Sequence, residues 1–203
     1  SDAGVGGLVV GCGSGAALRA AAVRSRGGKS SRVYFRLGHR HWYHSEVWPF
    51  VSPAFVKGNS AGSYGPEGSR GSLQDVLSGQ MEFTYFPGGG NPLPATITYH
   101  DLTEGVRDIG GARVTAQFLN HPAMTLGYRV EADGVAVVYL VDHEPFSDEL
   151  WRAGDEPGRI ESILHDGDRR HARFMADADL VIHDAQYTPD EYAAKKTWGQ
   201  SSY

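Results

Sequence analysis

Apolar residues recur along the chain in short runs that are separated by glycine-rich or polar segments. Runs of this length, bounded by turn-forming residues, are typical of β-strands. The predicted strands cover residues 8–10, 32–37, 95–102, 112–119, 124–132, 135–141 and 179–182. The Asp133-Gly134 dipeptide predicts a tight hairpin because it tolerates the positive φ of a type I′ turn, and Gly110-Gly111 predicts another reversal.

Helical patterns are fewer than strand patterns. The predicted helices, in which apolar residues recur mostly at helical spacing, cover residues 72–81, 160–175 and 189–196. Residues 51–70 and 86–94 are rich in proline and glycine and are expected to form long loops. No internal repeat or low-complexity linker interrupts the sequence, so we expect one domain over residues 1–203. Strands outnumber helices and hairpins mix with helical crossovers, which predicts an α/β fold with sheets at its centre.

Composition excludes several classes of protein. With 40% hydrophobic and 21% charged residues, the chain is neither disordered nor a coiled coil. Its longest apolar runs are strand-sized, so we expect no membrane span. The net charge of −5 provides no global basic field, and nucleic acid is therefore not an expected partner. Cys12 is the only cysteine, so no intramolecular disulfide can form and we expect a reducing compartment, the cytoplasm.

Metal-binding side chains follow four of the predicted strands, at the point where each apolar run ends. These side chains lie in segments 38–44, 120–122, 142–144 and 183–186, each of which contains histidine. Sites in layered α/β folds gather where strand ends and loops converge, so these side chains are expected to meet. Imidazole and carboxylate are the ligands that zinc prefers when cysteine is absent.

The three histidines of segment 38–44 strengthen this interpretation. His39 and His41 would point the same way from an extended segment, because side chains alternate with period two. Any one histidine is most simply a surface or hydrogen-bonded residue. Three histidines within six residues, repeated at three further strand ends, favour a metal site.

With these residues the chain resembles the metallo-β-lactamase superfamily, and more closely its phosphodiesterase branch, which includes the tRNA 3′-end-processing endonucleases. The segments that resemble family motifs, in family order, are residues 8–15, 39–44, 121, 142, 183–186 and 200–202. Residues 39–44 read His-Arg-His-Trp-Tyr-His where the family has His-x-His-x-Asp-His. Any one of these motifs alone is weak, whereas the ordered set is specific.

The resemblance implies an α/β fold, an αββα sandwich of two mixed β-sheets flanked by helices, with the metal site at one rim. It implies hydrolysis by water that one or two zinc ions activate. By resemblance, His39, His41 and His121 hold the first zinc, and Asp142 bridges to a second zinc that also uses His44. Asp142 and His183 are the expected catalytic residues, as proton acceptor and as contact to the phosphoryl group. Compared with the family the sequence begins after the first strands, so we expect one sheet to lack members or to depend on a partner, and a homodimer is left open.

The sequence departs from the family pattern at residues that carry the chemistry. Tyr43 replaces an aspartate, and a phenol is a poor substitute for a carboxylate as metal ligand or as proton acceptor. Gln200 replaces a histidine and cannot deliver a proton. Gly11 replaces the aspartate of the early turn, and the family's last metal histidine has no counterpart within residues 1–203. We therefore expect one zinc ion and a lost second site.

Two functions remain open from the sequence. The first is a metal-dependent hydrolase with a one-zinc site, acting on a small phosphodiester or nucleotide-like substrate. The second is a catalytically degenerate member that binds a nucleotide-like ligand or a protein. Trp42, Tyr43 and Trp48 could stack on a base, although core packing is the commoner role of such aromatic residues. Processing of tRNA is less favoured, because the charge is acidic and no basic exosite is recognisable.

Overall fold

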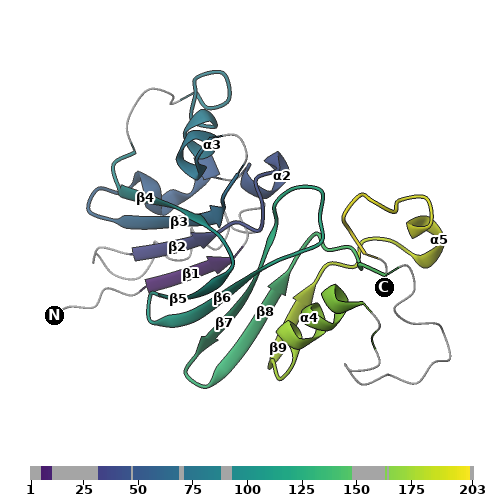
Figure 1. The fold of residues 1–203 in the computed structure, drawn as a ribbon. Coiled ribbons are helices and arrows are strands. Elements are labelled where there is room, and N and C mark those ends of the chain that lie inside the picture. The colour runs from purple at the N-terminus through teal and green to yellow at the C-terminus, as the bar shows by residue number, and fades with distance from the viewer. Residues whose placement is uncertain are drawn as a thin grey trace. The chain divides into compact units, whose positions relative to one another are not determined.

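The structure is a computed structural model that describes residues 6–10, 32–46, 48–68, 71–87, 93–147, 163 and 165–201. It divides into two compact units, Ser1–Thr103 and Glu104–Tyr203, and each unit contains one β-sheet (Figure 1). The two units are described in turn. The expectation of a single domain over residues 1–203 stays a prediction.

The sheet of the first unit is wholly parallel. Its strands, in spatial order, are β1 (Gly6–Val10), β2 (Arg32–Arg36), β3 (Ser60–Pro66) and β4 (Thr96–Leu102). Each strand pairs in parallel with the next strand in the chain. The expectation of two mixed sheets is therefore wrong for this unit.

Strand β3 lies in the centre of this sheet, where the sequence predicted part of a long loop. Its two glycines and terminal proline are poor strand formers, and pairing on both edges overrides that local preference. Gly62 is required by close packing, because an added Cβ would lie 2.9 Å from the Tyr64 ring. The same predicted loop also contains the 3₁₀ helix η2 (Ser52–Phe55), and η1 (Trp48–Phe50) and the short helix α2 (Trp42–Ser45) precede it.

One face of the parallel sheet carries the core of the first unit. Alternate residues of the β2 segment are buried on this face, with helix α3 (Leu73–Gly79) contributing two leucines. The core cluster contains Val33, Phe35, Leu37, Trp48, Val51, Ala61, Leu73 and Leu77. Trp48 packs edge-on against Phe35 with ring centroids 5.7 Å apart, so its role is core packing. Helix α3 starts with the capping box of Ser72 and Asp75, which confirms the predicted helix at residues 72–81.

The sheet of the second unit is mixed. Its strands, in spatial order, are β5 (Gly105–Ile109), β6 (Ala112–Phe118), β7 (Leu126–Ala132), β8 (Val135–Leu140) and β9 (Leu180–His183). The first four strands are antiparallel and β9 pairs in parallel with β8. Both predicted reversals are confirmed, because Gly110, Gly111, Asp133 and Gly134 all have positive φ. Strand β5 was not predicted.

Helix α4 (Asp166–Met175) precedes β9 and contributes Phe174 to a second core cluster, beside Leu119, Val138 and Leu140. It confirms the end of the predicted helix at 160–175, but it begins only at Asp166, because His165 is extended and caps it. Residues 160–162 and 164 of that prediction lie outside the described residues. Helix α5 (Pro189–Tyr192) is shorter than the predicted helix at 189–196. No helix among the described residues is both long enough and apolar enough to cross a membrane.

Candidate functional site

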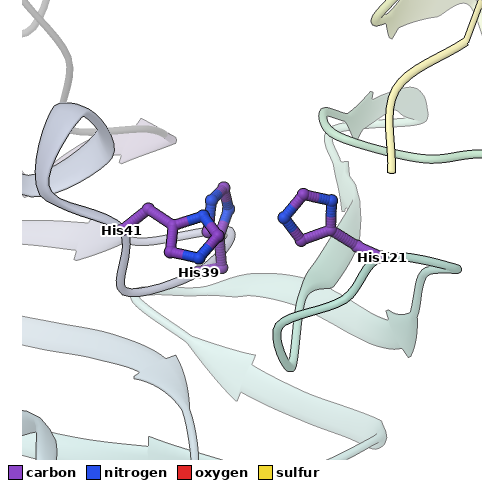
Figure 2. Close-up of side chains that lie close together, drawn as sticks. All are labelled: His39, His41 and His121. Carbon is purple, nitrogen blue, oxygen red and sulfur yellow. The ribbon is translucent and has the colours of Figure 1, made fainter. Parts of the chain in front are cut away.

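His39 and His41 lie just beyond the end of β2 in the first unit. The Leu37 amide donates to the Tyr64 carbonyl oxygen at 2.8 Å, so the extended backbone continues past the strand. Figure 2 shows the two imidazole rings close together, with ring centroids 4.4 Å apart. His39 is fully buried and His41 is exposed. The predicted period-two alternation therefore brings two imidazoles together within this unit, with ligand atoms within 4.8 Å of each other.

His44 joins the same cluster through helix α2. The helix begins directly after His41, and the His44 amide donates to the His41 carbonyl oxygen at 3.0 Å. This turn places the His44 ring 4.2 Å from the His39 ring, measured between centroids. The first unit thus contributes three imidazoles from six consecutive residues, which is the grouping that the sequence predicted.

Arg40 anchors the histidine loop to the rest of the first unit. Its guanidinium donates to the Pro66 and Gly71 carbonyl oxygens at 2.9 and 2.7 Å. It also forms an ion pair with Asp101, which accepts from the Leu73 amide at 2.9 Å. One planar cation therefore fixes the ends of β3 and β4 and the start of α3 against the loop.

Replacement of Arg40 by lysine is expected to lower the free energy of unfolding by about 2 kcal/mol, because an ammonium cannot satisfy three acceptors in the guanidinium geometry. Urea denaturation measures the change. Arg32→Ala is the matched control, since Arg32 is an exposed arginine of the same sheet and should shift stability by about 0.5 kcal/mol or less. Equal destabilisation by both changes would contradict the anchoring role.

His121 and Asp142 follow strands β6 and β8 in the second unit. The Nδ1 atom of His121 lies 2.9 Å from the Gly199 carbonyl oxygen. A carbonyl only accepts, so this nitrogen carries the proton and Nε2 keeps its lone pair. Gly199 has a φ of +77°, and an added Cβ there would lie 2.1 Å from the same nitrogen. The buried Asp142 accepts a hydrogen bond from Gln200 Nε2 at 3.2 Å, so Gln200 holds the carboxylate.

Glu144 holds the segment that carries Gly199 and Gln200. Its carboxylate accepts hydrogen bonds from the Thr197 amide at 2.7 Å, from the Gly199 amide at 3.0 Å and from the Tyr192 hydroxyl at 3.0 Å. The sequence placed Glu144 in the polar segment 142–144 but gave it no role, because its partners lie about fifty positions further along the chain. Glu144 therefore positions the groups that orient His121 and Asp142.

Glu144→Gln is expected to release His121 from its fixed tautomer, because the new amide NH₂ would face backbone N–H donors instead of accepting from them. Nitrogen NMR of the imidazole in the metal-free protein measures the tautomer. The parent chain should show a protonated Nδ1, and the variant a mixture of the two tautomers. Glu131→Gln, which removes a surface carboxylate of the same unit, should leave the His121 signal unchanged. An unchanged signal in Glu144→Gln would contradict the positioning role.

A second group of imidazoles lies in the second unit, formed by His143, His171 and His183. The rings of His143 and His171 stack with centroids 3.7 Å apart and planes within 6°. Nε2 of His171 lies 2.9 Å from Nε2 of His183, and Nδ1 of His183 lies 2.6 Å from the Asp184 carbonyl oxygen. The ring centroids of His171 and His183 are 5.2 Å apart, as a nearly straight N–H···N hydrogen bond requires.

Burial lowers the pKa of two of these histidines. Desolvation is the main cause in both, and it takes the pKa of His143 to about 2 and that of His171 to about 4, with neighbouring imidazoles adding to the effect. Both rings are therefore neutral near pH 7. His171 was not singled out from the sequence, because it lies on helix α4 with no motif around it. His183 remains a predicted catalytic residue, and its ring is held by His171 and the Asp184 carbonyl.

No protein-family model matches the chain, and no curated protein matches it either. Among solved structures, the chain is similar to the metallo-β-lactamase fold protein YhfI from Bacillus subtilis, with 17% identity and a TM-score of 0.58 over 96% of the chain. It is also similar to the short form of human tRNase Z, ELAC1, with 20% identity and a TM-score of 0.60 over 95% of the chain.

A third similar structure is a diphosphatase of the PhnP family, with 16% identity and a TM-score of 0.52 over 96% of the chain. The chain spans 65% of the Bacillus protein, 72% of the human protein and 59% of the diphosphatase. These similarities define the class of fold. The chain has the α/β metallo-β-lactamase fold, which confirms the predicted fold class.

Proposed function

We propose that the protein is a metal-dependent hydrolase of small phosphodiesters that uses one zinc ion. The proposed ligands are His39 and His41 from the first unit and His121 and Asp142 from the second. By resemblance, the first metal position would use His39, His41, His121 and Asp142, and a second position would use His44 and Asp142. The second position lacks the carboxylate that Tyr43 replaces, so we propose that only the first position is filled tightly.

The oriented imidazole of His121 is the observation that carries this proposal. Metal-binding histidines usually donate the N–H of the other ring nitrogen to a carbonyl or carboxylate, which fixes the tautomer and the ring. His121 makes this contact through the Gly199 carbonyl, which the Glu144 carboxylate in turn positions. Three imidazoles and one carboxylate are a chemically suitable set for zinc.

The chain's own residues would carry the remaining steps. A bound zinc ion lowers the pKa of a water molecule toward neutrality and polarises the scissile group. Asp142, held by Gln200, is the proposed acceptor of the proton from the attacking water. His183 is the proposed contact to the phosphoryl group, and this contact requires a proton on Nε2, the nitrogen that lies 2.9 Å from Nε2 of His171. Gln200 can donate a hydrogen bond but cannot protonate the leaving group.

Metal content per chain, measured together with turnover of a generic phosphodiester, tests the proposal. Protein purified without chelator is expected to contain one zinc ion per chain and to hydrolyse bis(4-nitrophenyl) phosphate weakly. His39→Ala and His121→Ala should each remove the zinc. His100→Ala is the control, because His100 lies in the first unit and stacks on Tyr64 outside both ligand sets. Two zinc ions per chain, or zinc that survives both substitutions, would contradict the proposal.

The second candidate is a degenerate member that binds a nucleotide-like ligand or a protein without cleaving it. The sequence changes at Tyr43 and Gln200 favour it, since both remove groups that the reaction uses. The two functions differ in turnover rather than in zinc content. A chain that retains one zinc ion and shows no hydrolysis would support this second function.

A further inference from the structure

A cavity of about 360 Å³ lies in the first unit, beside helices α2 and α3. Its lining residues are Arg40, Trp42, Val76, Gly79, Gln80, Glu82 and Tyr85. This volume falls at the small end of the range of ligand sites, which is about 300–1,000 Å³. None of the lining residues belongs to the proposed zinc ligands, although Trp42 follows His41 directly in the chain.

Two aromatic rings form one wall of this cavity. Trp42 and Tyr85 have ring centroids 5.6 Å apart and planes tilted by 52°, and they are 51% and 60% exposed. Trp48, six residues later, is almost completely buried in the core. Two large aromatic residues that stay exposed side by side in a cavity offer faces on which a planar ligand can stack.

Gln80 adds a polar group to the same cavity. It is 4% exposed, and its Nε2 donates to the Ser45 hydroxyl at 2.6 Å. Its Oε1 has no hydrogen-bond partner among the described residues. A buried acceptor without a partner is costly, so it is satisfied best by a ligand that brings an N–H donor. The aromatic wall and this acceptor together select a planar group that carries N–H donors at its edge.

We propose that this cavity binds the base of a nucleotide, stacked against Trp42 and Tyr85, with an N–H of the base donated to Gln80. The proposal that this cavity is part of a substrate site rests on the proposed function. Binding of the base itself needs neither a metal ion nor turnover. Nucleobases fit this combination of stacking and edge hydrogen bonds.

The test uses calorimetry on the metal-free full chain with adenosine 5′-monophosphate and with ribose 5-phosphate, which lacks the base. We expect binding of adenosine 5′-monophosphate and none of ribose 5-phosphate. Trp42→Leu should weaken binding at least about fivefold, the lower limit for loss of one base stack. Gly79→Leu should block the cavity, since an added Cβ at this residue of α3 meets no atom within 4 Å and the longer side chain would occupy the open space.

Phe50→Leu is the matched control, because Phe50 is a 60% exposed aromatic residue of the same unit that does not line the cavity. Its binding should equal that of the parent chain. Ribose 5-phosphate binding as tightly as the nucleotide, or unchanged nucleotide binding in Gly79→Leu, would overturn the proposal. Zinc content is measured on the same samples after metal loading. Base binding without zinc uptake would contradict the hydrolase proposal but support the base subsite. Zinc uptake without base binding would support the hydrolase proposal but contradict the base subsite.

Discussion

Replacement of Tyr43 by aspartate is expected to raise zinc retention and phosphodiester hydrolysis together, with a rate increase of about 10²–10⁴-fold. Helix α2 places position 43 between His41 and His44, the position that supplies a carboxylate in the motif that the sequence resembles. A tyrosine with a pKa near 10 is neutral at pH 7 and cannot replace that carboxylate as ligand or as proton acceptor. The unmodified chain should therefore hydrolyse phosphodiesters weakly or not at all.

Tyr43→Asn is the control for this change, because asparagine has the size of aspartate without its charge, and it should not restore hydrolysis. Both variants are assayed with bis(4-nitrophenyl) phosphate after metal loading, with zinc measured by elemental analysis. Adding Gln200→His to Tyr43→Asp should help only substrates with poor leaving groups, since a nitrophenolate departs without a proton. Turnover by the unmodified chain at an ordinary enzymatic rate, roughly 1–10³ per second, would show that the site is not degenerate.

The sheet of the second unit was largely predictable because the sequence patterns that mark its strands and turns are local. Alternating or continuous apolar runs gave β6, β7 and β8, and Asp133-Gly134 gave the turn between the last two. Strand β3 was not predictable in this way. Its two glycines sit where side chains crowd the strand, because an added Cβ would lie 2.9 Å from the Tyr64 ring at Gly62 and 3.2 Å from Leu73 of helix α3 at Gly65. That crowding is a property of the folded sheet.

The candidate site likewise has some residues that the sequence predicts and others that it does not. Period-two alternation in one short segment was enough to predict that His39 and His41 come together. Glu144 and His171 depend on contacts between distant segments, so no spacing rule could select them. Glu144 meets a loop about fifty residues later, and His171 reaches His183 because the α4–β9 crossover brings the two together. The residues that position the other side chains of a site are therefore the hardest to predict from a sequence.

The free energy of unfolding is expected to fall steeply as the pH drops from 6.5 toward 4. His143 and His171 stay neutral in the folded chain, with pKa values of about 2 and about 4, while both take up protons near pH 6.5 when unfolded. The unfolded state then binds more protons than the folded state, so acid favours unfolding. Each histidine contributes a slope of about 1.4 kcal/mol per pH unit, which for His171 amounts to about 3 kcal/mol over this interval. That loss is a large part of the 5–15 kcal/mol that usually stabilises a folded protein.

Urea denaturation of the metal-free protein at pH 7, 6 and 5, in the presence of chelator, measures this dependence. His171→Phe is the informative variant, because phenylalanine can keep the stack with His143 but takes up no proton. Its slope between pH 6 and 5 should be smaller than that of the parent by about 1.4 kcal/mol per pH unit. His165→Phe is the control, since His165 is exposed at the start of helix α4 and its loss should leave the slope as it is. A parent chain whose stability is flat from pH 7 to 5 would mean that these two rings are hydrated and titrate normally when folded.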